Sequence, residues 1–378
     1  MALLTLDTVC QYVKTQLKDE ASAPLDVSQE LRASEVTGGN LNYAFVVRDD
    51  KNAVFVKQAP EYIKVIGPTA QLTRERMRLE VMVYQEWQQR GAEISRYIPR
   101  IWKFDDNAMA FIMEFLESYQ LLQRSLFEGD AQKSVALQLG ECMAMMHSRT
   151  HCSRLDPAEV SRLTSSYENR LLRDIQLEYV FSKCYRCDPR AAALREDAKF
   201  MAEVEELKAV YNGRALRNLA LCHGDLHAGS VMVDGPSLGV KVIDPEFAIF
   251  GPPGLDVGSL LSTYVLAYCF HQAQKHPCAP EMMAAAQKIW EAYVGAMKAA
   301  DFSSELLQQI EVETLGFIGC EVVRTALGLA FERSLRIEDE KLKASAEDAA
   351  LHLGVTCILR RREGMAALTA AIADFAAG

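Results

Sequence analysis

The first third of the chain is rich in short apolar runs that are separated by polar turns. Three of these runs have the length and the alternation of strands: residues 31–36, 41–48 and 53–57. The breaks between them are Thr37-Gly38-Gly39-Asn40 and the polar stretch 48–52. Runs joined by short turns of this kind are typical of antiparallel hairpins. We therefore expect two hairpins here, and a further strand at residues 111–116.

Helical periodicity occurs on both sides of these runs and predominates in the rest of the chain. Residues 3–17 and 73–90 repeat apolar positions every three to four residues, and Met77, Val83, Tyr84 and Trp87 share one face of the second segment. Beyond Ser118 the longest periodic stretches are also helical: 131–146, 189–211, 281–298 and 304–336. A short β insertion interrupts them, with strands expected at 219–222, 231–233 and 240–243.

These patterns predict an α+β fold with two lobes. A β-rich amino-terminal lobe covers residues 1–116, and an α-rich carboxy-terminal lobe covers residues 117–378. The length of 378 residues agrees with this division, since one domain usually contains about 100–200 residues. No internal repeat and no long linker is visible.

Composition and charge narrow the class of protein. The chain is 49% hydrophobic and 24% charged, which excludes a collagenous or a wholly disordered protein. It carries 41 Lys and Arg against 51 Asp and Glu, a formal net charge of −10. A polyanion would meet net repulsion, so we do not expect a nucleic-acid partner.

The apolar segments and the cysteines indicate a cytoplasmic protein. The first ten residues lack the basic start of a signal peptide and contain Asp7. The longest uncharged apolar run, 257–270, is too short to cross a bilayer and is expected to be a buried helix, so no membrane contact is expected. The ten scattered cysteines are expected to be reduced thiols.

The chemistry is concentrated in residues 221–256, LCHGDLHAGSVMVDGPSLGVKVIDPEFAIFGPPGLD. A hydroxyl that attacks a phosphoryl group needs a carboxylate to orient it and accept its proton, and Asp225 can serve this need. Asp244 and Glu246 lie two apart after a strand. If the extended geometry persists through Pro245, both carboxylates point to one side and form a divalent-metal site. The alternative is that these acids only cap turns.

The amino-terminal half contains matching residues. Gly38-Gly39-Asn40 lies between two strands, where backbone N–H groups can approach phosphate oxygens, although most such turns are hairpins without a ligand. Lys57 ends an apolar strand and shares a face with Phe55, so its ammonium group is expected to point inward. Glu80 lies within the apolar stripe of the following helix, where an unpaired carboxylate is unfavourable. We therefore expect a Lys57–Glu80 ion pair, either at an active site or purely structural.

These residues resemble the aminoglycoside-phosphotransferase-like kinases, and among them most closely the methylthioribose kinases. The resemblance covers nearly the whole chain and rests on four stretches: GGNLNYAF at 38–45, VKQAPEYIKVIG at 56–67, HGDLHAGS at 223–230 and VIDPEFAIFGPPGLDVG at 242–258. Most relatives have Asn where this chain has Ser230, and a single main Asp at the metal strand. Ser230 and Asp244-Pro245-Glu246 are similar to the methylthioribose kinase pattern.

The resemblance implies a bilobal protein-kinase-like fold and a small-molecule kinase. The enzyme would use ATP and Mg²⁺ to phosphorylate the 1-hydroxyl of 5-methylthioribose in methionine salvage, as a homodimer. Asp225 would be the catalytic base and contact the sugar, and Asp244 and Glu246 would hold Mg²⁺. Lys57, paired with Glu80, would contact the α- and β-phosphates.

The remaining ATP contacts also follow from the resemblance. Gly38, Gly39, Asn40 and Asn42 would cover the phosphates, while Glu114 and Leu116 would contact adenine through their backbone. His223 would stiffen the catalytic loop and Asp256 would anchor it.

Two departures from the family pattern fall where the sugar is expected. This chain has Ala70 in a loop that carries a Trp in the relatives, and Arg324-Thr325 where they have two adjacent arginines. Arg324 still offers a cationic fork to the sugar or to the developing phosphate charge. The acceptor therefore has alternatives: a 5-deoxypentose, an aminoglycoside or an amino alcohol. A nucleotide-binding pseudokinase is the alternative from another class.

Other motifs are weaker. Cys184 and Cys187 have the spacing of half a zinc site, but no second pair follows at a suitable distance. The sequence also lacks a GxxxxGK[ST] loop, a GxGxxG loop and a DFG…APE segment, which argues against P-loop, Rossmann and protein-kinase assignments.

Overall fold

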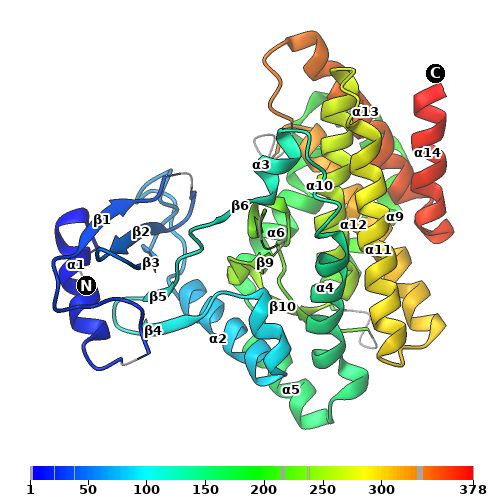
Figure 1. The fold of residues 1–378 in the computed structure, drawn as a ribbon. Helices are drawn as coiled ribbons and strands as arrows, with labels where there is room; N and C mark the ends of the chain where they lie inside the picture. The colour runs from blue at the N-terminus through cyan, green and yellow to red at the C-terminus, as the bar shows by residue number, and fades with distance from the viewer. Residues whose placement is uncertain are drawn as a thin grey trace. The chain divides into compact units, whose positions relative to one another are not determined.

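The computed structural model describes residues 3–20, 22–37, 39–213, 218–235, 237, 239–329 and 335–377. The chain packs as two compact units, coloured by residue number in Figure 1. Unit 1 comprises Met1–Tyr119 and Lys241–Phe247, and unit 2 comprises Gln120–Val240 and Ala248–Gly378. The sequence did not indicate that residues 241–247 pack with the amino-terminal part. The functional division at 116/117 stays a prediction.

Unit 1 is built on a five-stranded antiparallel sheet of order β1-β2-β3-β5-β4. Its strands are β1 (Arg32–Glu35), β2 (Tyr43–Arg48), β3 (Ala53–Gln58), β4 (Ile101–Asp105) and β5 (Ala110–Glu114). Both expected hairpins are present as β1–β2 and β2–β3. Strand β4 was not predicted, because no residue in it is fully buried and its pairing with β5 is irregular between Ile101 and Lys103.

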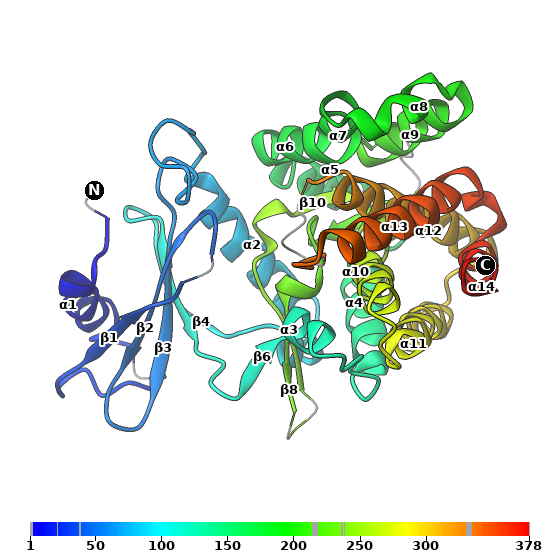
Figure 2. The ribbon, with the colours of Figure 1, turned by 90° about the horizontal axis from the view of Figure 1, so that it is seen from above.

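One helix packs on each face of this sheet, as Figure 2 shows for α1 (Leu6–Leu17) and α2 (Glu75–Gln89). Alternation along β3 sorts its side chains between the two faces. Val54 and Val56 join the core under α1, whereas Phe55 packs in the core under α2. Lys57 follows Phe55 by two residues, so it meets α2, as expected.

Unit 2 is mainly helical and is centred on α10 (Pro253–Ala273). This helix packs against α11 (Ala279–Ala299), α12 (Ser304–Ala326) and α13 (Glu340–Leu359). Nearly all of α10 is buried, which confirms the buried helix expected at 257–270. In the part of the chain that the structure describes, no helix has both the length and the apolar character required to cross a membrane.

The other helices of unit 2 partly differ from the expected bounds. They are α3 (Leu122–Phe127), α4 (Ala136–Thr150), α5 (Pro157–Ser166), α6 (Arg170–Phe181), α7 (Lys183–Cys187), α8 (Ala192–Glu196), α9 (Ala198–Tyr211) and α14 (Met365–Ala377). The stretch expected at 189–211 is split, because the side chain of Asp197 accepts the backbone N–H groups of Lys199 and Phe200 and starts a new helix. The helix expected to reach 336 ends at Ala326.

Short strands complete the fold: β6 (Tyr119–Leu121), β7 (Ala220–Cys222), β8 (Val231–Asp234), β9 (Gly239–Val242) and β10 (Ile249–Gly251). The chain passes between the units within β6 and β9. Strand β7 pairs with β10 in antiparallel fashion, with Cys222 opposite Ile249. The α+β class, with a sheet in unit 1 and helices in unit 2, is confirmed, and all ten cysteines are free thiols.

Candidate active site

Lys57 is the centre of a buried charge cluster in unit 1. Its Nζ lies 2.7 Å from Oε2 of Glu80 and 2.7 Å from Oδ1 of Asp244. The Lys57 and Glu80 side chains are 6% and 0% exposed, and that of Asp244 is 41% exposed. The expected Lys57–Glu80 ion pair is therefore present, and Asp244 is a second partner.

Burial and charge act against each other in this cluster. Burial opposes the charged form of Lys57, but Asp244 and Glu80 offset it and raise the pKa of the ammonium group. Burial raises the pKa of Glu80 above its usual range, against the lowering effect of Lys57. An ammonium group held charged beside a carboxylate at the surface is suited to meet an anionic ligand.

The backbone at Asp244 corrects the geometry expected from the sequence. Asp244 has φ of 62°, in the left-handed region, and Pro245–Phe247 form a 3₁₀ turn. The strand therefore does not stay extended through Pro245, because β9 ends at Val242. The backbone N–H of Asp244 donates to the hydroxyl of Tyr84 at 3.1 Å. Left-handed Asp residues are uncommon and often lie at functional sites.

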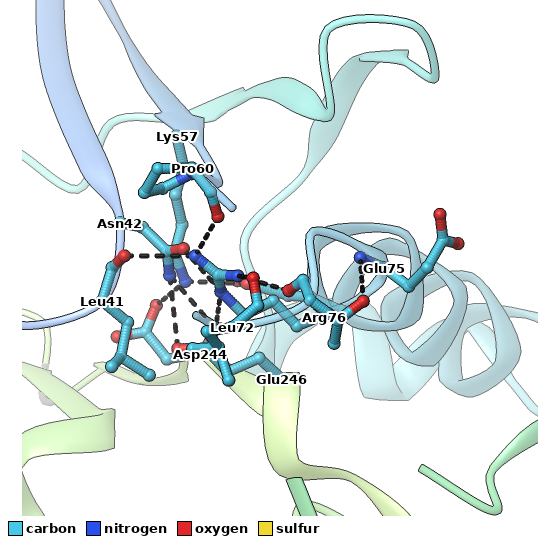
Figure 3. A network of polar contacts seen from close by, with 11 residues as sticks. Leu41, Asn42, Lys57, Pro60, Leu72, Glu75, Arg76, Asp244 and Glu246 are labelled. Atoms are coloured by element: carbon cyan, nitrogen blue, oxygen red, sulfur yellow. Dashed lines mark hydrogen bonds and ion pairs between the residues drawn. The ribbon is translucent and has the colours of Figure 1, made fainter. Parts of the chain in front are cut away.

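Glu246 is held by two residues of unit 1 (Figure 3). The Asn42 amide donates from Nδ2 to Oε1 at 3.3 Å and to Oε2 at 3.1 Å of the Glu246 carboxylate. Arg76 Nε lies 3.4 Å from Oε2 and donates to Oδ1 of Asn42 at 3.1 Å. The turn that replaces the extended strand thus still places Asp244 and Glu246 in one polar cluster (Figure 3).

These carboxylates fit a divalent cation. Mg²⁺ prefers hard oxygen ligands and is usually bound through one or two carboxylates together with substrate phosphates. The Asp244 side chain is partly exposed, and the Glu246 carboxylate lies in the same polar cluster. Asp244 and Glu246 are the residues of unit 1 that would hold the metal.

The residues expected to cover the phosphates differ in their environment. Gly38 lies outside the described residues, and Gly39 is exposed with room for a side chain. Asn40 is exposed, and its carbonyl accepts the N–H of Val65 at 3.1 Å. Asn42 is buried, and both ends of its amide are used on Glu246 and Arg76. The expected role of Asn42 in covering the phosphates stays a prediction.

The expected adenine contacts lie at the end of β5. The N–H of Glu114 already donates to the carbonyl of Arg100 at 2.8 Å, and its side chain lies 3.4 Å from Nζ of Lys241. Leu116 is buried, and its carbonyl accepts the N–H of Tyr119 at 3.2 Å. The adenine role of these two residues stays a prediction.

The catalytic loop expected in unit 2 follows β7 and is fixed through its backbone. The N–H groups of His223 and Gly224 donate to the carboxylate of Asp256 at 2.6 and 2.9 Å. Gly224 has φ of 86°, which explains the glycine. His147 Nε2 lies 3.2 Å from the same carboxylate, while its Nδ1 lies 3.1 Å from the hydroxyl of Tyr293. Asp256 therefore anchors the loop, as the resemblance implied.

Asp225 lies at the end of this anchored turn. Its backbone N–H donates to Nδ1 of His223 at 3.3 Å, which fits the stiffening role expected of that histidine. The carboxylate lies 3.6 Å from Nε2 of His227 and 4.0 Å from Nη2 of Arg324. The hydroxyl of Ser230 donates to the carbonyl of Asp225 at 3.2 Å, so this serine supports the loop.

Arg324 is presented to Asp225 by α12. Its Nε donates to Oε2 of Glu321 at 2.7 Å, one helical turn earlier, and the side chain is 6% exposed. The neighbouring Thr325 is buried, and its hydroxyl donates to the Glu321 carbonyl at 2.8 Å. Unit 2 therefore places the guanidinium group of Arg324 near the carboxylate of Asp225.

Sequence reasoning missed two parts of the site. Arg76 was not singled out, although it precedes Glu80 by four residues and so shares its inward face of α2. His147 was not assigned a role either, and it is buried against Asp256. No sequence signal joins His147 to Asp256, because 109 residues separate them.

The sequence is similar to one protein family over more than half of its length. The family described as "Phosphotransferase enzyme family" matches residues 32–293. The methylthioribose kinase of Geobacillus sp. (strain WCH70) is 29% identical over 358 residues, 88% of this chain and 86% of that protein. Methylthioribose kinase 1 of Oryza sativa subsp. japonica is 31% identical over 388 residues, again 88% of this chain and 86% of that protein.

The fold has solved counterparts as well. The crystal structure of a choline kinase from Cryptosporidium parvum Iowa II superposes with a TM-score of 0.54 at 13% identity, covering 96% of each chain. This likeness concerns the fold alone, and it confirms the expected kinase-like architecture.

Proposed function

The chain belongs to the phosphotransferase enzyme family, and from this membership we propose that it transfers the γ-phosphoryl group of ATP to the 1-hydroxyl of 5-methylthioribose. The methylthioribose kinases that it resembles support this acceptor, since they match about nine-tenths of the chain. Ser230 and Asp244-Pro245-Glu246 support it further. The reaction would belong to methionine salvage.

Unit 1 would bind the nucleotide and the metal. Lys57 would contact the α- and β-phosphates. Glu80 would keep the Lys57 ammonium group charged and pointing toward these phosphates. Asp244 and Glu246 would hold Mg²⁺, which neutralises phosphate charge as the phosphoryl group is transferred. The backbone of residues 39–42 would lie over the phosphates.

Unit 2 would act on the acceptor. Asp225 would accept the proton of the sugar hydroxyl as its oxygen bonds to the γ-phosphorus. The bond from that phosphorus to the β,γ-bridging oxygen breaks, and ADP leaves. Arg324, 4.0 Å from Asp225, would stabilise the negative charge of the transferred group.

The observation that carries the proposal is the double ion pair of Lys57 with Glu80 and Asp244, each at 2.7 Å. It joins a nucleotide-binding lysine to a metal-binding carboxylate within one unit. The test is kcat/KM, measured by ADP release, across 5-methylthioribose, 5-deoxyribose, ribose, an aminoglycoside and choline. The proposal expects methylthioribose to have the highest value. A higher value for an aminoglycoside or for choline would reject the sugar assignment.

Ala70 and Thr325 favour a second candidate, the same chemistry on a less strictly chosen 5-deoxypentose. Without an aromatic wall the pocket loses apolar contact with the 5-substituent, and each buried methylene contributes about 0.8 kcal/mol. The wild type should then prefer methylthioribose over 5-deoxyribose by less than about 100-fold, and Ala70→Trp with Thr325→Arg should widen the gap. A wild-type preference far above that value would reject the loose pocket.

The pseudokinase alternative is tested by the same assay, since it expects nucleotide binding with no acceptor-dependent ADP release. The homodimer and the cytoplasmic location stay predictions.

A further inference from the structure

Arg76 is a fully buried charged side chain of unit 1. Its side chain is 0% exposed, although it lies in the first turn of α2. A guanidinium group has five N–H donors in a fixed planar fork. Burying this group is unfavourable unless the donors are paired and the charge is balanced.

The structure supplies an acceptor for each donor (Figure 3). Nε donates to Oδ1 of Asn42 at 3.1 Å, and Nη2 donates to the carbonyls of Leu41 at 3.2 Å and Pro60 at 3.0 Å. Nη1 donates to the carbonyls of Leu72, at 3.4 Å, and Thr73. The charge is balanced by Glu246, whose Oε2 lies 3.4 Å from Nε.

These acceptors come from separate segments of unit 1. Leu41 and Asn42 lead into β2, Pro60 follows β3, and Leu72 and Thr73 precede α2. The same guanidinium group therefore fixes the loop expected over the phosphates and faces a carboxylate expected to bind metal.

Asn42 completes the link. Because its Oδ1 accepts from Arg76, its Nδ2 must face Glu246, where it donates to both carboxylate oxygens at 3.3 and 3.1 Å. The position of the Glu246 carboxylate is thus tied to the position of the loop that ends at Asn42.

We propose that Arg76 and Asn42 are positioning residues that hold the phosphate-covering loop and the metal ligand Glu246 as one unit. The inference rests on the proposed function for the role of Glu246, and it adds two residues to which the sequence gave no such role. It follows that metal affinity depends on side chains that do not ligate the metal.

Lysine cannot replace Arg76 in this role. An ammonium group has three donors on one atom, so it leaves at least two of the five acceptors without a partner. Leu at position 42 has nearly the size of Asn, but it can neither accept from Arg76 nor donate to Glu246. Arg76→Lys therefore loosens the whole network, whereas Asn42→Leu removes the link between Arg76 and Glu246.

Arg361 provides a matched control. It is a buried arginine of unit 2, 3% exposed, with Glu203 2.6 Å and Glu206 2.8 Å from its guanidinium nitrogens. Arg361→Lys has the same chemical change and a similar expected cost in stability, but it is remote in sequence from every residue assigned to the nucleotide or the metal.

The experiment measures metal binding rather than turnover. Binding of Mn²⁺ to each variant with saturating ADP is followed by the loss of the free Mn²⁺ signal in electron paramagnetic resonance, and ADP binding without metal by calorimetry. We expect Arg76→Lys and Asn42→Leu to raise the Kd of Mn²⁺ at least about tenfold, and Arg361→Lys to leave it within about twofold at a similar loss of melting temperature. Arg76→Lys should also weaken metal-free ADP binding.

Unchanged Mn²⁺ affinity in Asn42→Leu overturns the inference, whether or not Arg76→Lys folds, because the Leu side chain has nearly the same size as Asn. An equal loss of Mn²⁺ affinity in Arg361→Lys also overturns it, since the effect would then reflect stability alone. If the wild type binds Mn²⁺ and ADP but phosphorylates no sugar, the proposed acceptor is rejected. The Mn²⁺ affinities of the variants still test the inference in that case. A wild type that binds no Mn²⁺ with ADP would reject both.

Discussion

The two units hold their functional carboxylates in different ways. In unit 1, Glu80 and Asp244 each lie 2.7 Å from Lys57, and Glu246 contacts Asn42 and Arg76. In unit 2, the Asp225 carboxylate lies 3.6 Å from Nε2 of His227 and 4.0 Å from Nη2 of Arg324, while its loop is fixed by backbone bonds to Asp256 of 2.6 and 2.9 Å.

This difference agrees with the two roles proposed for these carboxylates, which are ligand binding in unit 1 and proton acceptance in unit 2. Groups that bind phosphate and metal need fixed charge, and short ion pairs supply it. A carboxylate that accepts a proton during the reaction must keep its basicity, and a short ion pair would reduce it. The backbone bonds to Asp256 position the loop that carries this carboxylate. The predictions below test this contrast.

The largest effect is expected at Asp225. Asp225→Asn keeps the size of the side chain and removes its basicity, and a positioned base usually contributes about 10²–10⁴-fold in rate. We expect kcat to fall by that factor while the Kd of ATP changes less than about twofold. Turnover and calorimetric ATP binding on the same preparation provide the check. Near wild-type turnover would mean that another group is the base.

A second effect concerns the stability of unit 2 as a function of pH. Burial raises the pKa of Glu313 to about 7, against hydrogen bonds from Gln309 and Asn218. The folded state therefore binds a proton that the unfolded state has lost, so stability falls as pH rises from about 4.5 to 7.

Glu313→Gln removes this titration. Relative to the wild type, the variant should gain about 2 kcal/mol in unfolding free energy between pH 5 and pH 8. Denaturant unfolding at the two pH values measures the difference. Parallel pH profiles for the two proteins would show that Glu313 does not titrate in this range.

A smaller effect is expected on the Mg²⁺ dependence, which should change more for a substitution in unit 1 than for one in unit 2. Glu246→Gln removes a carboxylate from unit 1, whereas Ser230→Ala removes a hydroxyl that bonds to the Asp225 carbonyl in unit 2. We expect the Mg²⁺ midpoint at saturating ATP to rise about tenfold in Glu246→Gln, and much less in Ser230→Ala. If the midpoint does not move in the Glu246 variant, the Asp-x-Glu metal site is wrong.

The smallest effect concerns the backbone of Asp244. Asn and Asp tolerate the left-handed region better than Ala, for which it costs about 1 kcal/mol. Both Asp244→Asn and Asp244→Ala should lose the ion pair with Lys57, but the Ala variant should be less stable by about 1 kcal/mol. Their melting temperatures measure the gap. Equal stabilities would argue against a strained turn at this residue.

Much of the architecture could be predicted from the sequence because the signals were local. The hairpins followed from alternation around short turns, and the Lys57–Glu80 pair followed from two charges on apolar faces that had to meet. Strand β4 was missed because its apolar alternation is weak.

The parts that could not be predicted depend on contacts distant in sequence or on backbone angles. The packing of residues 241–247 with unit 1 brings Glu246 to Asn42, 204 positions away. The left-handed angle at Asp244 is not encoded by a glycine, so the sequence favoured an extended strand there. Arg76 was overlooked because an Arg on a helix is usually exposed.

The most direct test of the account is ³¹P nuclear magnetic resonance of the wild type with ATP, Mg²⁺ and 5-methylthioribose. The account predicts ADP together with a phosphomonoester resonance that is split by the anomeric proton, and neither product with Asp225→Asn on the same timescale. ATP consumption without a phosphorylated sugar, or a phosphate coupled to a different ring proton, would contradict the assignment of the 1-hydroxyl as the acceptor.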